Sequence, residues 1–425
     1  GASNSYDDYA PSQASAFSSG MEAIVEAALS DISSYTMLNF VEVADSASVL
    51  GDLRFGYTLN SSAGFGNDVL GWGTFPVSQN EIYYTASDAG DTWFSDALIS
   101  NYENAVAGDL YYNTVYHEIG HSLGLSHPHN TGTGGTGITF GTGNGTVGVG
   151  EHDGNPYTLM SYTTYVGGST SSPDQTHADG FMMDDIAALQ YLYGSNNTTN
   201  DTDTTYGSSD LTPNSEFEFT IWDAAGTDKI DWSSGITSAN IDLNSGSFSF
   251  FGSNVTSVSD VDISSMGAGE GVLGIGYGVV IENATGGSAN DTLTGNSSVN
   301  ILTGGSGSDS LTGGAGNDIF VFNSLDGSDT VTDWNTANDT LQFSATTFSA
   351  SGVSGISAGS AIEANDFISG SNITNASSNT GQTFLFDTDS AVLYYDADGI
   401  PGGAIQVADL GTNITIDQDD IVMIA

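Results

Sequence analysis

The chain has 425 residues, with 52 Asp and Glu against only two basic residues, Arg54 and Lys229, so its formal net charge is −50. This charge disfavours nucleic acids and anionic membranes as partners, and the absence of cysteine excludes disulfides, thiolate nucleophiles and cysteine metal sites. No stretch approaches the ~20 apolar residues of a membrane-spanning helix. The opening residues, "GASNSYDDYA", lack the pattern of a secretory signal peptide, so we expect any export signal to lie elsewhere or to have been removed.

Helical periodicity is found in the first part of the chain. Apolar residues recur at three- and four-residue spacing over 20–36 and 183–194, which predicts two helices, and Gly194 is expected to end the second. Residues 38–44 and 52–58 alternate between apolar and polar types and predict strands. We therefore expect an α+β domain over residues 1–195.

The organisation changes near residue 195. After the polar stretch at 196–205 helical periodicity disappears, and short β-like runs follow at 217–223, 278–284 and 318–322, separated by Gly, Asn, Asp and Ser. This pattern predicts a second, all-β domain over residues 196–425.

The stretch "HEIGHSLGLSHP", residues 117–128, contains three of the six histidines. His117 and His121 are one helical turn apart, so both imidazoles can reach one ion, and Glu118 points beside them, close to a water on that ion. Gly124 can take the left-handed conformation that ends a helix, which lets the chain turn back and present His127. Three imidazoles and an open fourth position are typical of a catalytic zinc site.

This five-residue pattern resembles the signature of the metzincin zinc proteases, which also carry a methionine turn below the metal. Here "YTLMSY" places Met160 and Tyr162 downstream, and Pro128 directly follows the third histidine; both features resemble the serralysin branch. The resemblance implies a zincin-type protease fold, Tyr162 as a further zinc ligand, and Met160 as an apolar floor that does not bind metal. Without the resemblance, Tyr162 would be interpreted as a core aromatic.

The expected chemistry is peptide-bond hydrolysis by a zinc-activated water. Glu118 is the expected general base, and Tyr162, once displaced from the metal, could hydrogen-bond the oxyanion. A serine triad is excluded, because no Gly-x-Ser-x-Gly elbow lies in a strand-to-helix context with the required partners.

The other histidines and a glycine-rich stretch receive weaker interpretations. We expect His129 and His152 to be loop residues and have no physical account of His177. Residues 131–150 contain Gly143, Gly145 and Gly148 at dinucleotide-binding spacing, but they lack a flanking strand, a helix and a lysine, so we predict a rim of the active-site cleft.

Four nine-residue copies follow one another without a gap over residues 286–321: "GGSANDTLT", "GNSSVNILT", "GGSGSDSLT" and "GGAGNDIFV". Each offers six loop residues and a short strand, and two copies make one coil of a parallel β-roll, so that loops of alternate copies stack. The pattern resembles the hemolysin-type (RTX) calcium repeat, which serralysins carry after the protease domain. The strands should centre on Leu293, Leu302, Leu311 and Phe320.

Calcium prefers a cage of oxygens, and the loops supply it with carbonyls and acidic side chains. The expected repeat ligands are Gly287, Ala289, Asp291, Asn300, Gly304, Gly305, Ser306, Gly307, Asp309, Gly313, Gly314, Ala315, Gly316 and Asp318. By resemblance, further ligands are expected at Asp203, Asp223, Asp228 and Glu282. Asp291 and Asp309 should form a strong column of calcium sites, and Asn300 and Asp318 a weaker one. We expect the acidic turns at 387–389 and 396–399 to be hairpin turns rather than ion sites.

Two function classes remain open. The favoured one is a secreted zinc metalloendopeptidase with one catalytic Zn²⁺ and several structural Ca²⁺ ions. The alternative is a non-enzymatic calcium-binding surface or adhesion protein with an inactive protease domain. The intact Glu118 is evidence against this alternative. For the favoured class we expect protein and peptide substrates, a monomer, no nucleic-acid partner and no membrane span.

The composition and the last residues predict where the protein acts. The charge suits an extracellular bacterial protein in marine or saline surroundings. The end, "DQDDIVMIA", resembles the uncleaved C-terminal export signal of serralysins, which implies type I secretion machinery as a partner; Ile421 to Ile424 can equally form a last strand.

Overall fold

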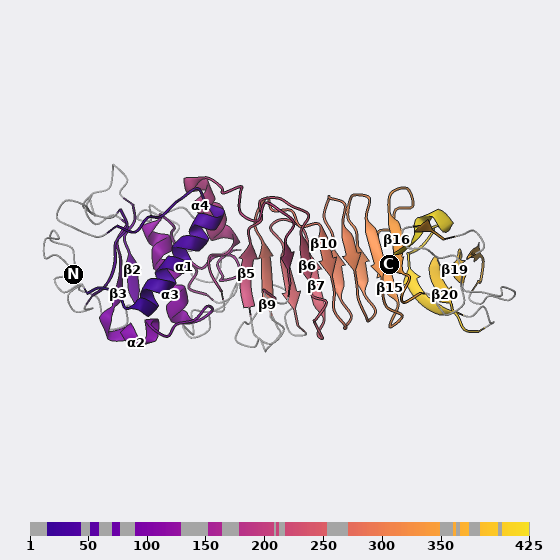
Figure 1. Cartoon of the computed structure of the whole chain (residues 1–425), viewed down its shortest axis with the longest axis horizontal. Coiled ribbons are helices and arrows are strands. Elements are labelled where there is room, and N and C mark those ends of the chain that lie inside the picture. The colour runs from indigo at the N-terminus through magenta and orange to yellow at the C-terminus, as the bar shows by residue number, and fades with distance from the viewer. Residues whose placement is uncertain are drawn as a thin grey trace.

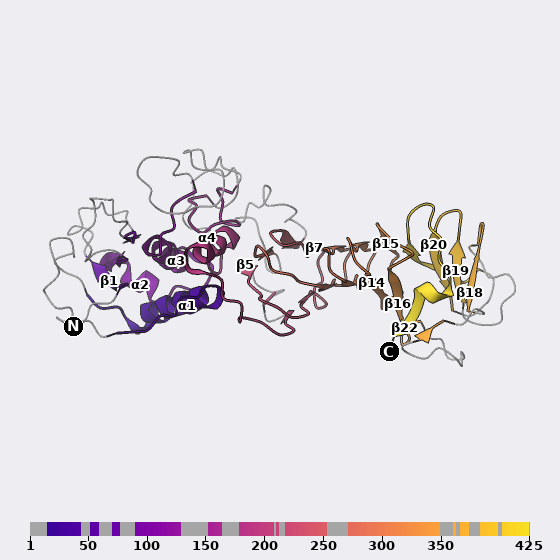
Figure 2. The ribbon, with the colours of Figure 1, turned by 90° about the horizontal axis from the view of Figure 1, so that it is seen from above.

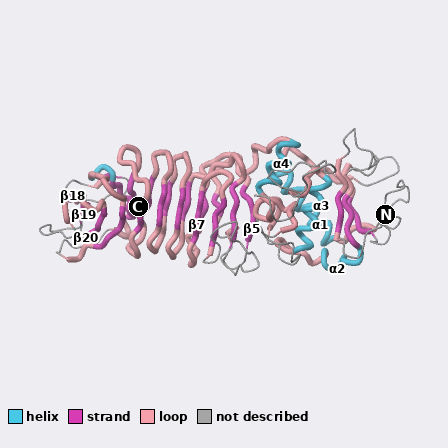
Figure 3. The backbone as a smooth tube through the Cα atoms, turned by 180° about the vertical axis from the view of Figure 1, so that it is seen from behind, coloured by secondary structure: helices cyan, strands magenta, loops and turns pink. Residues whose placement is uncertain are grey.

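The computed structural model describes residues 15–43, 52–58, 70–76, 90–128, 152–163, 178–207, 210–211, 217–252, 271–348, 360–362, 366–373, 383–397 and 402–424. These parts form an elongated molecule with the longer helices at its N-terminal end and strands stacked along the remainder (Figure 1). Figure 3 shows the same division from behind, with cyan helices beside a long row of magenta strands.

The N-terminal part packs helices against a small sheet. The helices are α1 (Ser19–Tyr35), the 3-10 helix η1 (Asp96–Leu98), α2 (Ile99–Tyr102), α3 (Leu110–Ser122) and α4 (Met183–Tyr193). The strands β1 (Phe55–Thr58), β3 (Thr92–Ser95) and β2 (Gly71–Gly73) lie in that order, with β1 parallel and β2 antiparallel to β3.

Helices α1, α3 and α4 share one apolar core. Met21 and Ile32 of α1, Ile119 of α3, and Ile186 and Leu189 of α4 are buried in the same cluster. The predicted helices at 20–36 and 183–194 are therefore confirmed within one residue at each end. Gly194 ends α4 with φ +82°, as its position predicted.

The two predicted strands of this part differ in outcome. Residues 55–58 of the predicted 52–58 segment form β1, but residues 38–43 form no strand, so that prediction is wrong over its described part. Leu38 and Phe40 pack on the helical core while Val41 and Val43 are exposed. The alternation is real, but its inner face contacts helices rather than a neighbouring strand.

The C-terminal part is a parallel β-roll of two facing sheets. Within the described residues, one sheet has the order β17-β22-β16-β14-β12-β10-β6-β4 and the other β18-β19-β20-β21-β15-β13-β11-β7-β8-β9-β5. The first contains β4 (Thr205–Tyr206), β6 (Lys229–Asp231), β10 (Asn283–Thr285), β12 (Ile301–Thr303), β14 (Ile319–Phe322), β16 (Thr340–Ser344), β17 (Ser360–Ala361) and β22 (Ile421–Ile424). The second contains β5 (Phe217–Ile221), β7 (Ala239–Asp242), β8 (Phe248–Phe251), β9 (Gly271–Ile275), β11 (Thr292–Thr294), β13 (Ser310–Thr312), β15 (Asp329–Val331), β18 (Phe367–Gly370), β19 (Thr383–Asp387), β20 (Val392–Asp396) and β21 (Ile405–Asp409).

The repeat sets the register of the roll. Leu293 pairs with Leu311 in one sheet and Leu302 with Phe320 in the other, each two nine-residue copies later and parallel. All four side chains are fully buried between the sheets. The predicted coil of two copies is confirmed, because alternate copies are the hydrogen-bonded neighbours.

The roll extends beyond the four repeats recognised in the sequence. β15 continues the β13 side and β16 continues the β14 side, in parallel. Strand β22 then returns to pair with β16, which brings the C-terminus back beside the roll in Figure 2. The 3-10 helix η3 (Gln418–Asp420) precedes it. The segment 421–424 is thus a strand, as one of its two interpretations predicted.

Other predicted strands fit less evenly. The 217–223 run contains β5 and the 318–322 run contains β14, but in the 278–284 run only Asn283 and Ala284 belong to a strand. Val279 and Ile281 are nevertheless buried, so their apolar character reflects packing in a loop. The turn at 387–389 joins β19 to β20 as a hairpin, as predicted. The division into domains 1–195 and 196–425 stays a prediction.

Candidate metal centre

Helix α3 carries the first two histidines of the motif. Asp109 begins the helix: its carboxylate accepts hydrogen bonds from the backbone N–H groups of Tyr112, at 2.7 Å, and Val106, at 2.9 Å. The buried face of α3, including Tyr116 and Ile119, faces the domain core. The cap at Asp109 and the buried face fix the position of α3, and with it the positions of His117 and His121.

The end of α3 explains how the third histidine arrives. The N–H of Leu125 bonds the carbonyl of Gly120 and the N–H of Gly124 bonds that of His121, both at 2.9 Å. This pair of bonds is a Schellman motif, which needs a left-handed residue, and Gly124 has φ +101°. The turn predicted at Gly124 is confirmed, and it reverses the chain towards His127.

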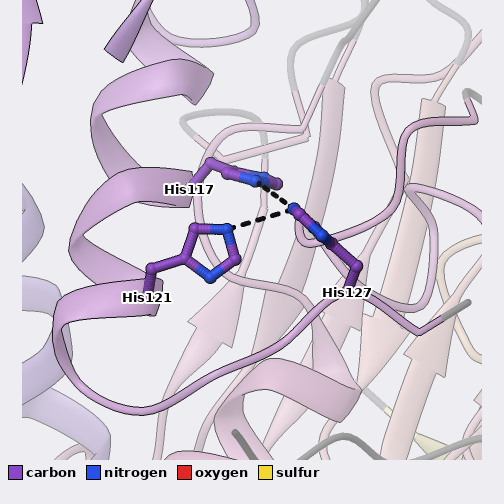
Figure 4. A group of neighbouring side chains, drawn as sticks. All are labelled: His117, His121 and His127. Carbon is purple, nitrogen blue, oxygen red and sulfur yellow. Dashed lines mark hydrogen bonds between the residues drawn. The ribbon is translucent and has the colours of Figure 1, made fainter. Parts of the chain in front are cut away.

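The three imidazoles converge on one point. The Nε2 atom of His127 lies 3.1 Å from Nε2 of His117 and 3.1 Å from Nε2 of His121 (Figure 4). All three ligand atoms lie within 4.8 Å of one another. Nitrogens bound to tetrahedral zinc at about 2.0–2.1 Å would be roughly 3.3 Å apart. The donor set therefore fits a zinc ion with little rearrangement.

The opposite ring nitrogens are held by backbone carbonyls. His117 Nδ1 lies 2.9 Å from the oxygen of Leu159, and His121 Nδ1 lies 2.8 Å from that of Leu125. A carbonyl can only accept, so these contacts place the proton on Nδ1 and leave the Nε2 lone pairs facing the convergence point. Burial lowers the pKa of His121, which further favours the neutral ligand form.

Glu118 lies beside the triad and is anchored by β2. The backbone N–H of Gly73 donates to Glu118 Oε2 at 2.6 Å. Burial raises the pKa of Glu118 to about 8, and this hydrogen bond opposes the shift. A Cβ at position 73 would lie 2.1 Å from the Glu118 carbonyl oxygen, so glycine lets β2 approach α3 this closely. Gly73 could not be identified from the sequence, because no local pattern indicates that it contacts Glu118.

Met160 lies beneath the motif helix. Its side chain is buried in the core, and a Cβ built on Gly120 would come within 2.8 Å of its sulfur. The glycine inside "HEIGH" therefore makes room for the methionine, a role that the spacing of the motif alone does not indicate. Met160 contributes packing, in line with the expected apolar floor.

Tyr162 lies beside His127 and His117. Its ring centroid is 4.3 Å from that of His127 and 5.8 Å from that of His117, and the residue is 53% exposed. Partial burial, followed by the nearby charge of Glu118, raises its pKa to about 12. Because the side chain is partly exposed, Tyr162 is not a core aromatic, which was the alternative interpretation of this residue.

Asp185 connects the methionine turn to α4 and was not singled out from the sequence. Its buried carboxylate accepts hydrogen bonds from Thr158 Oγ1 (2.6 Å), the Leu159 N–H (2.7 Å) and the Met182 N–H (3.1 Å). Burial raises the pKa of Asp185 to about 7, although the three hydrogen bonds lower it. Because the Leu159 carbonyl orients His117, Asp185 positions the triad indirectly.

The remaining predicted residues of this part are placed as follows. Pro128 is buried at the end of the described segment 90–128. His152 lies in a turn, as expected of a loop residue, but it also contacts Asp184 of α4. His129, His177 and the glycine-rich segment 131–150 lie outside the described residues.

In the roll, the structure stacks the repeat acids in two columns. The N–H of Asp291 donates to Asp309 Oδ1 at 2.8 Å, and that of Asn300 to Asp318 Oδ1 at 2.9 Å. The columns continue to residues outside the predicted set. The Asp309 N–H donates to Asp329 Oδ1 and the Asp318 N–H to Asp339 Oδ1, both at 3.0 Å. The two later copies carry insertions, which hid Asp329 and Asp339 from a strict nine-residue pattern.

The loops between the stacked acids contain the other expected calcium ligands. Gly305, Gly307, Gly314 and Gly316 all have positive φ, which only glycine adopts readily. Gly287 donates its N–H to Asp291 Oδ2 at 2.6 Å. Gly304, Ser306, Gly313, Ala289 and Ala315 lie in the same coils.

The four acids expected outside the repeats also lie near one another. The Asp228 N–H donates to Glu282 Oε2 at 2.7 Å, and the Thr227 N–H to Asp203 Oδ1 at 3.0 Å. Burial raises the pKa values of Asp223 and Asp228, with a further increase from neighbouring acids. Within the described residues, these acids do not bring three ligand oxygens within 4.8 Å of one another, whereas the histidines do so with their nitrogens.

Comparison with known proteins gives matches to both parts. The Matrixin model of the M10 peptidases matches residues 8–133, and the model of the M10 serralysin C terminal matches residues 185–393. Fold and site together define a metzincin protease domain joined to a parallel β-roll. Within that class, the C-terminal part and the curated relatives match the serralysin-type metzincins.

Curated relatives agree with this assignment. Serralysin B of Dickeya chrysanthemi is 34% identical over 247 residues, covering 56% of this chain and 45% of the relative. Metalloprotease AprA of Pseudomonas entomophila (strain L48) is 32% identical over 260 residues, covering 56% and 49%. Serralysin of Proteus mirabilis is 31% identical over 277 residues, covering 60% and 50%. The chain thus spans about half the length of the curated relatives it matches.

Among the helices that the structure describes, none combines the length and the apolar character needed to cross a membrane.

Proposed function

We propose that this protein is a zinc-dependent endopeptidase that hydrolyses peptide bonds of proteins. The observation that carries the proposal is the convergence of three imidazole Nε2 atoms, with Glu118 beside them on the same helix. The family relationship supports the same assignment.

His117, His121, His127 and Tyr162 would hold the zinc. When bound, the metal supplies Lewis acidity, which polarises the scissile carbonyl and brings the pKa of a coordinated water to about 7. The two Nδ1 contacts keep His117 and His121 in the required tautomer without any movement of the backbone.

Glu118 is the proposed general base. Its carboxylate takes a proton from the attacking water and later delivers that proton to the departing amine nitrogen. The Gly73 N–H fixes Oε2, so the carboxylate is oriented before substrate arrives.

Tyr162 is the proposed donor to the carbonyl oxygen as negative charge develops there. Away from the metal, the hydroxyl is protonated at neutral pH, as in any tyrosine, and burial with the charge of Glu118 raises its pKa further, to about 12. It can therefore donate a hydrogen bond. Its partial exposure and its position beside His127 allow the ring to swing without repacking the core.

The deciding experiment is casein hydrolysis by the purified full-length chain at constant calcium. We expect activity to stop when a zinc-selective chelator is added and to return on adding zinc in equimolar amount. Activity that survives complete zinc removal, verified by metal analysis, would contradict the proposal.

We further propose that calcium ions bind between the coils of the roll. Asp309 and Asp228 each have one buried carboxylate oxygen, Oδ2, without a hydrogen-bond partner. Lys229, the residue after Asp228, is paired with Asp231 instead. A hard cation with oxygen ligands would satisfy both carboxylate oxygens. In the second column the Asn300 side-chain amide donates to the Glu282 carbonyl at 2.7 Å and accepts from the Asn296 N–H at 2.8 Å. Because Asn300 is neutral and hydrogen-bonded, we expect calcium to stabilise this column less than the column of Asp309.

The expected calcium dependence can be measured on the full-length chain. Calcium should raise the melting temperature of the roll, and Asp309→Asn should reduce that increase more than Asn300→Asp. A melting temperature that does not respond to calcium would contradict this part of the proposal.

We also propose an extracellular role with export by a type I secretion system, on the strength of the acidic segment before Ile421–Ile424. Deleting the chain from Asp419 should block export but leave protease activity in a refolded sample. Because β22 pairs with β16, the deletion also removes a strand. A fusion of residues 380–425 to an unrelated carrier therefore serves as the second test: a carrier that is not exported would contradict the proposal.

A further inference from the structure

The junction between the protease part and the roll contains a buried carboxylate that the proposed chemistry does not use. Strand β5 lies at the end of its sheet nearest the helices (Figure 1). Ala178 pairs with Glu218 of β5 as a parallel bridge, and the Asp179 N–H donates to the Glu218 carbonyl at 2.8 Å. The segment that leads into α4 therefore adds to the edge of the roll.

The surroundings of this contact are mostly apolar. Met183 of α4 packs with Phe248, Phe250 and Val272 of the roll, and Tyr157 contacts the same cluster. Val272 is the register partner of Glu218 in β9, so in a parallel pair the two side chains lie on the same face. The Glu218 side chain thus points to the interface rather than to solvent.

The Glu218 side chain is completely buried, and neither carboxylate oxygen has a hydrogen-bond partner. Thr220, two residues further along the same strand face, also has a buried hydroxyl oxygen without a partner. Buried polar atoms are nearly always satisfied, and an isolated buried carboxylate is strongly unfavourable unless a proton or a cation neutralises it.

A second carboxylate lies at the same place. Asp179 accepts a hydrogen bond from the Glu218 backbone N–H, and burial raises its pKa to about 6. Burial, followed by the charge of Asp179, raises the pKa of Glu218 to about 8. Two acids from different parts of the chain are therefore brought together where their charges repel.

No lysine or arginine is available to compensate them. The chain has two, Arg54 and Lys229. Arg54 is paired with Asp91 in the protease part, and Lys229 is paired with Asp231 at 2.8 Å. A proton alone would leave Glu218 with a buried hydroxyl donor and a carbonyl acceptor that still lack partners.

We propose that a calcium ion binds at this junction, with the carboxylates of Glu218 and Asp179 as its charged ligands. Calcium accepts oxygen ligands in irregular arrangements, so two carboxylates from separate elements and the Thr220 hydroxyl suit it better than they suit magnesium. The site is separate from the roll columns, and it would tie β5 to the segment that begins α4. Through Asp185 and Leu159, that helix supports the methionine turn.

The test is a calcium count on the full-length protein at pH 7.5, by elemental analysis after equilibrium dialysis against calcium. Glu218→Gln and Asp179→Asn should each bind one ion fewer per chain than the parent, and the double variant should again lose only one. Glu26→Gln, an exposed acid on α1, is the matched control and should bind the parental number.

Melting temperature separates this proposal from simple protonation. A calcium site predicts that Glu218→Gln melts below the parent in calcium and approaches it in chelator. If Glu218 is merely protonated, Glu218→Gln keeps the parental ion count. Calcium then raises the melting temperature of the variant by the same amount as that of the parent. Unchanged counts in both folded single variants would overturn the proposal. Zinc content and peptide hydrolysis are measured in parallel, so a failure of the protease assignment remains distinguishable.

Discussion

His152 Nδ1 lies 2.7 Å from Asp184 Oδ2, and the imidazole stacks on the Tyr157 ring at 3.9 Å. The other oxygen of the same carboxylate accepts a hydrogen bond from the Tyr277 hydroxyl of the roll at 2.8 Å. One buried carboxylate on α4 thus joins the loop before the methionine turn to the roll. This contact and the Glu218 bridge indicate that the two parts are held together by specific polar contacts as well as by apolar packing.

The first prediction tests that contact. Tyr277→Phe removes one hydrogen bond to a charged group, and because the tyrosine is partly exposed we expect a loss of about 1 kcal/mol, a few degrees in melting temperature. Calorimetry of the full-length chain in calcium provides the measurement. Tyr111→Phe on α3 is the control: the ring can keep its contact with Tyr102, so the variant should be neutral. An equal loss in both variants would argue against a linking role for Tyr277.

The second prediction concerns Glu118→Gln. The amide oxygen can still accept from the Gly73 N–H, so the fold and zinc content should persist, whereas turnover should fall on the order of a thousandfold or more because the proton acceptor is gone. Zinc analysis and single-turnover hydrolysis of a fluorogenic peptide measure both quantities. Glu103→Gln, an exposed acid before α3, is the control. Near-parental turnover in Glu118→Gln would refute the assigned base.

The motif itself was readable from the sequence because it is local. His117, Glu118, His121 and the Gly124 turn lie within one helix and its end, where spacing fixes geometry. Gly73, Leu159 and Asp185 could not be found in this way, since each reaches the site from a distant segment and depends on how the elements pack. The same holds for Glu218, which in sequence is one acid among 52 and becomes notable only through its burial.

The roll shows the same limit. Strict nine-residue spacing predicted the coils at 286–321, and the strand pairing confirms them. The insertions around Asp329 and Asp339 broke the spacing but not the stack, because longer loops can still close between strands in register.

The third prediction concerns Tyr162→Phe. The ring can keep its packing on His127, so substrate binding should change little, but the hydrogen bond to the developing oxyanion is lost. We expect kcat to fall on the order of a hundredfold with KM nearly constant. Steady-state kinetics on the same peptide measure both quantities. A rise in KM with kcat unchanged would contradict the proposed hydrogen bond from Tyr162 to the oxyanion.

The fourth prediction concerns the turn that delivers His127. Gly124→Ala meets no close contact, as the nearest atom to the new Cβ is 3.5 Å away, so its cost of about 1–2 kcal/mol comes from the left-handed backbone at φ +101°. Because the turn positions His127, zinc affinity should also fall. Competition with a chromogenic chelator measures that affinity. Gly180→Ala, whose nearest contact is likewise 3.5 Å and whose φ is not left-handed, should bind zinc as the parent does.

The last prediction combines calcium removal with pH. In the calcium-free chain, burial and then the charges of Asp329 and Asp291 raise the pKa of Asp309 to about 7, from 3.8 for the unperturbed group. Asp291 and Asp329 are each raised to about 6, again mainly by burial.

The sign follows from which state holds the proton more tightly. Since the folded pKa values are higher, the calcium-free roll is most stable below about pH 4 with respect to these groups, and that stability is lost as pH rises through about 7, by on the order of a few kcal/mol. Calcium ligands must be ionised, so calcium affinity should increase over the same window. The stabilisation by calcium should therefore grow from pH 5 to pH 8.

Calorimetry of calcium-depleted and calcium-loaded protein at four pH values across that window provides the measurement. The calcium-free melting temperature should fall with rising pH. General repulsion among the surface acids acts in the same direction, so the decisive comparison is between variants. Asp309→Asn should flatten the calcium-free slope because it removes the most strongly shifted member of the column, whereas Asp326→Asn, an exposed acid in the same coil, should leave the slope unchanged. Equal slopes in the two variants would show that surface charge, and not the buried column, sets the response of the roll to pH.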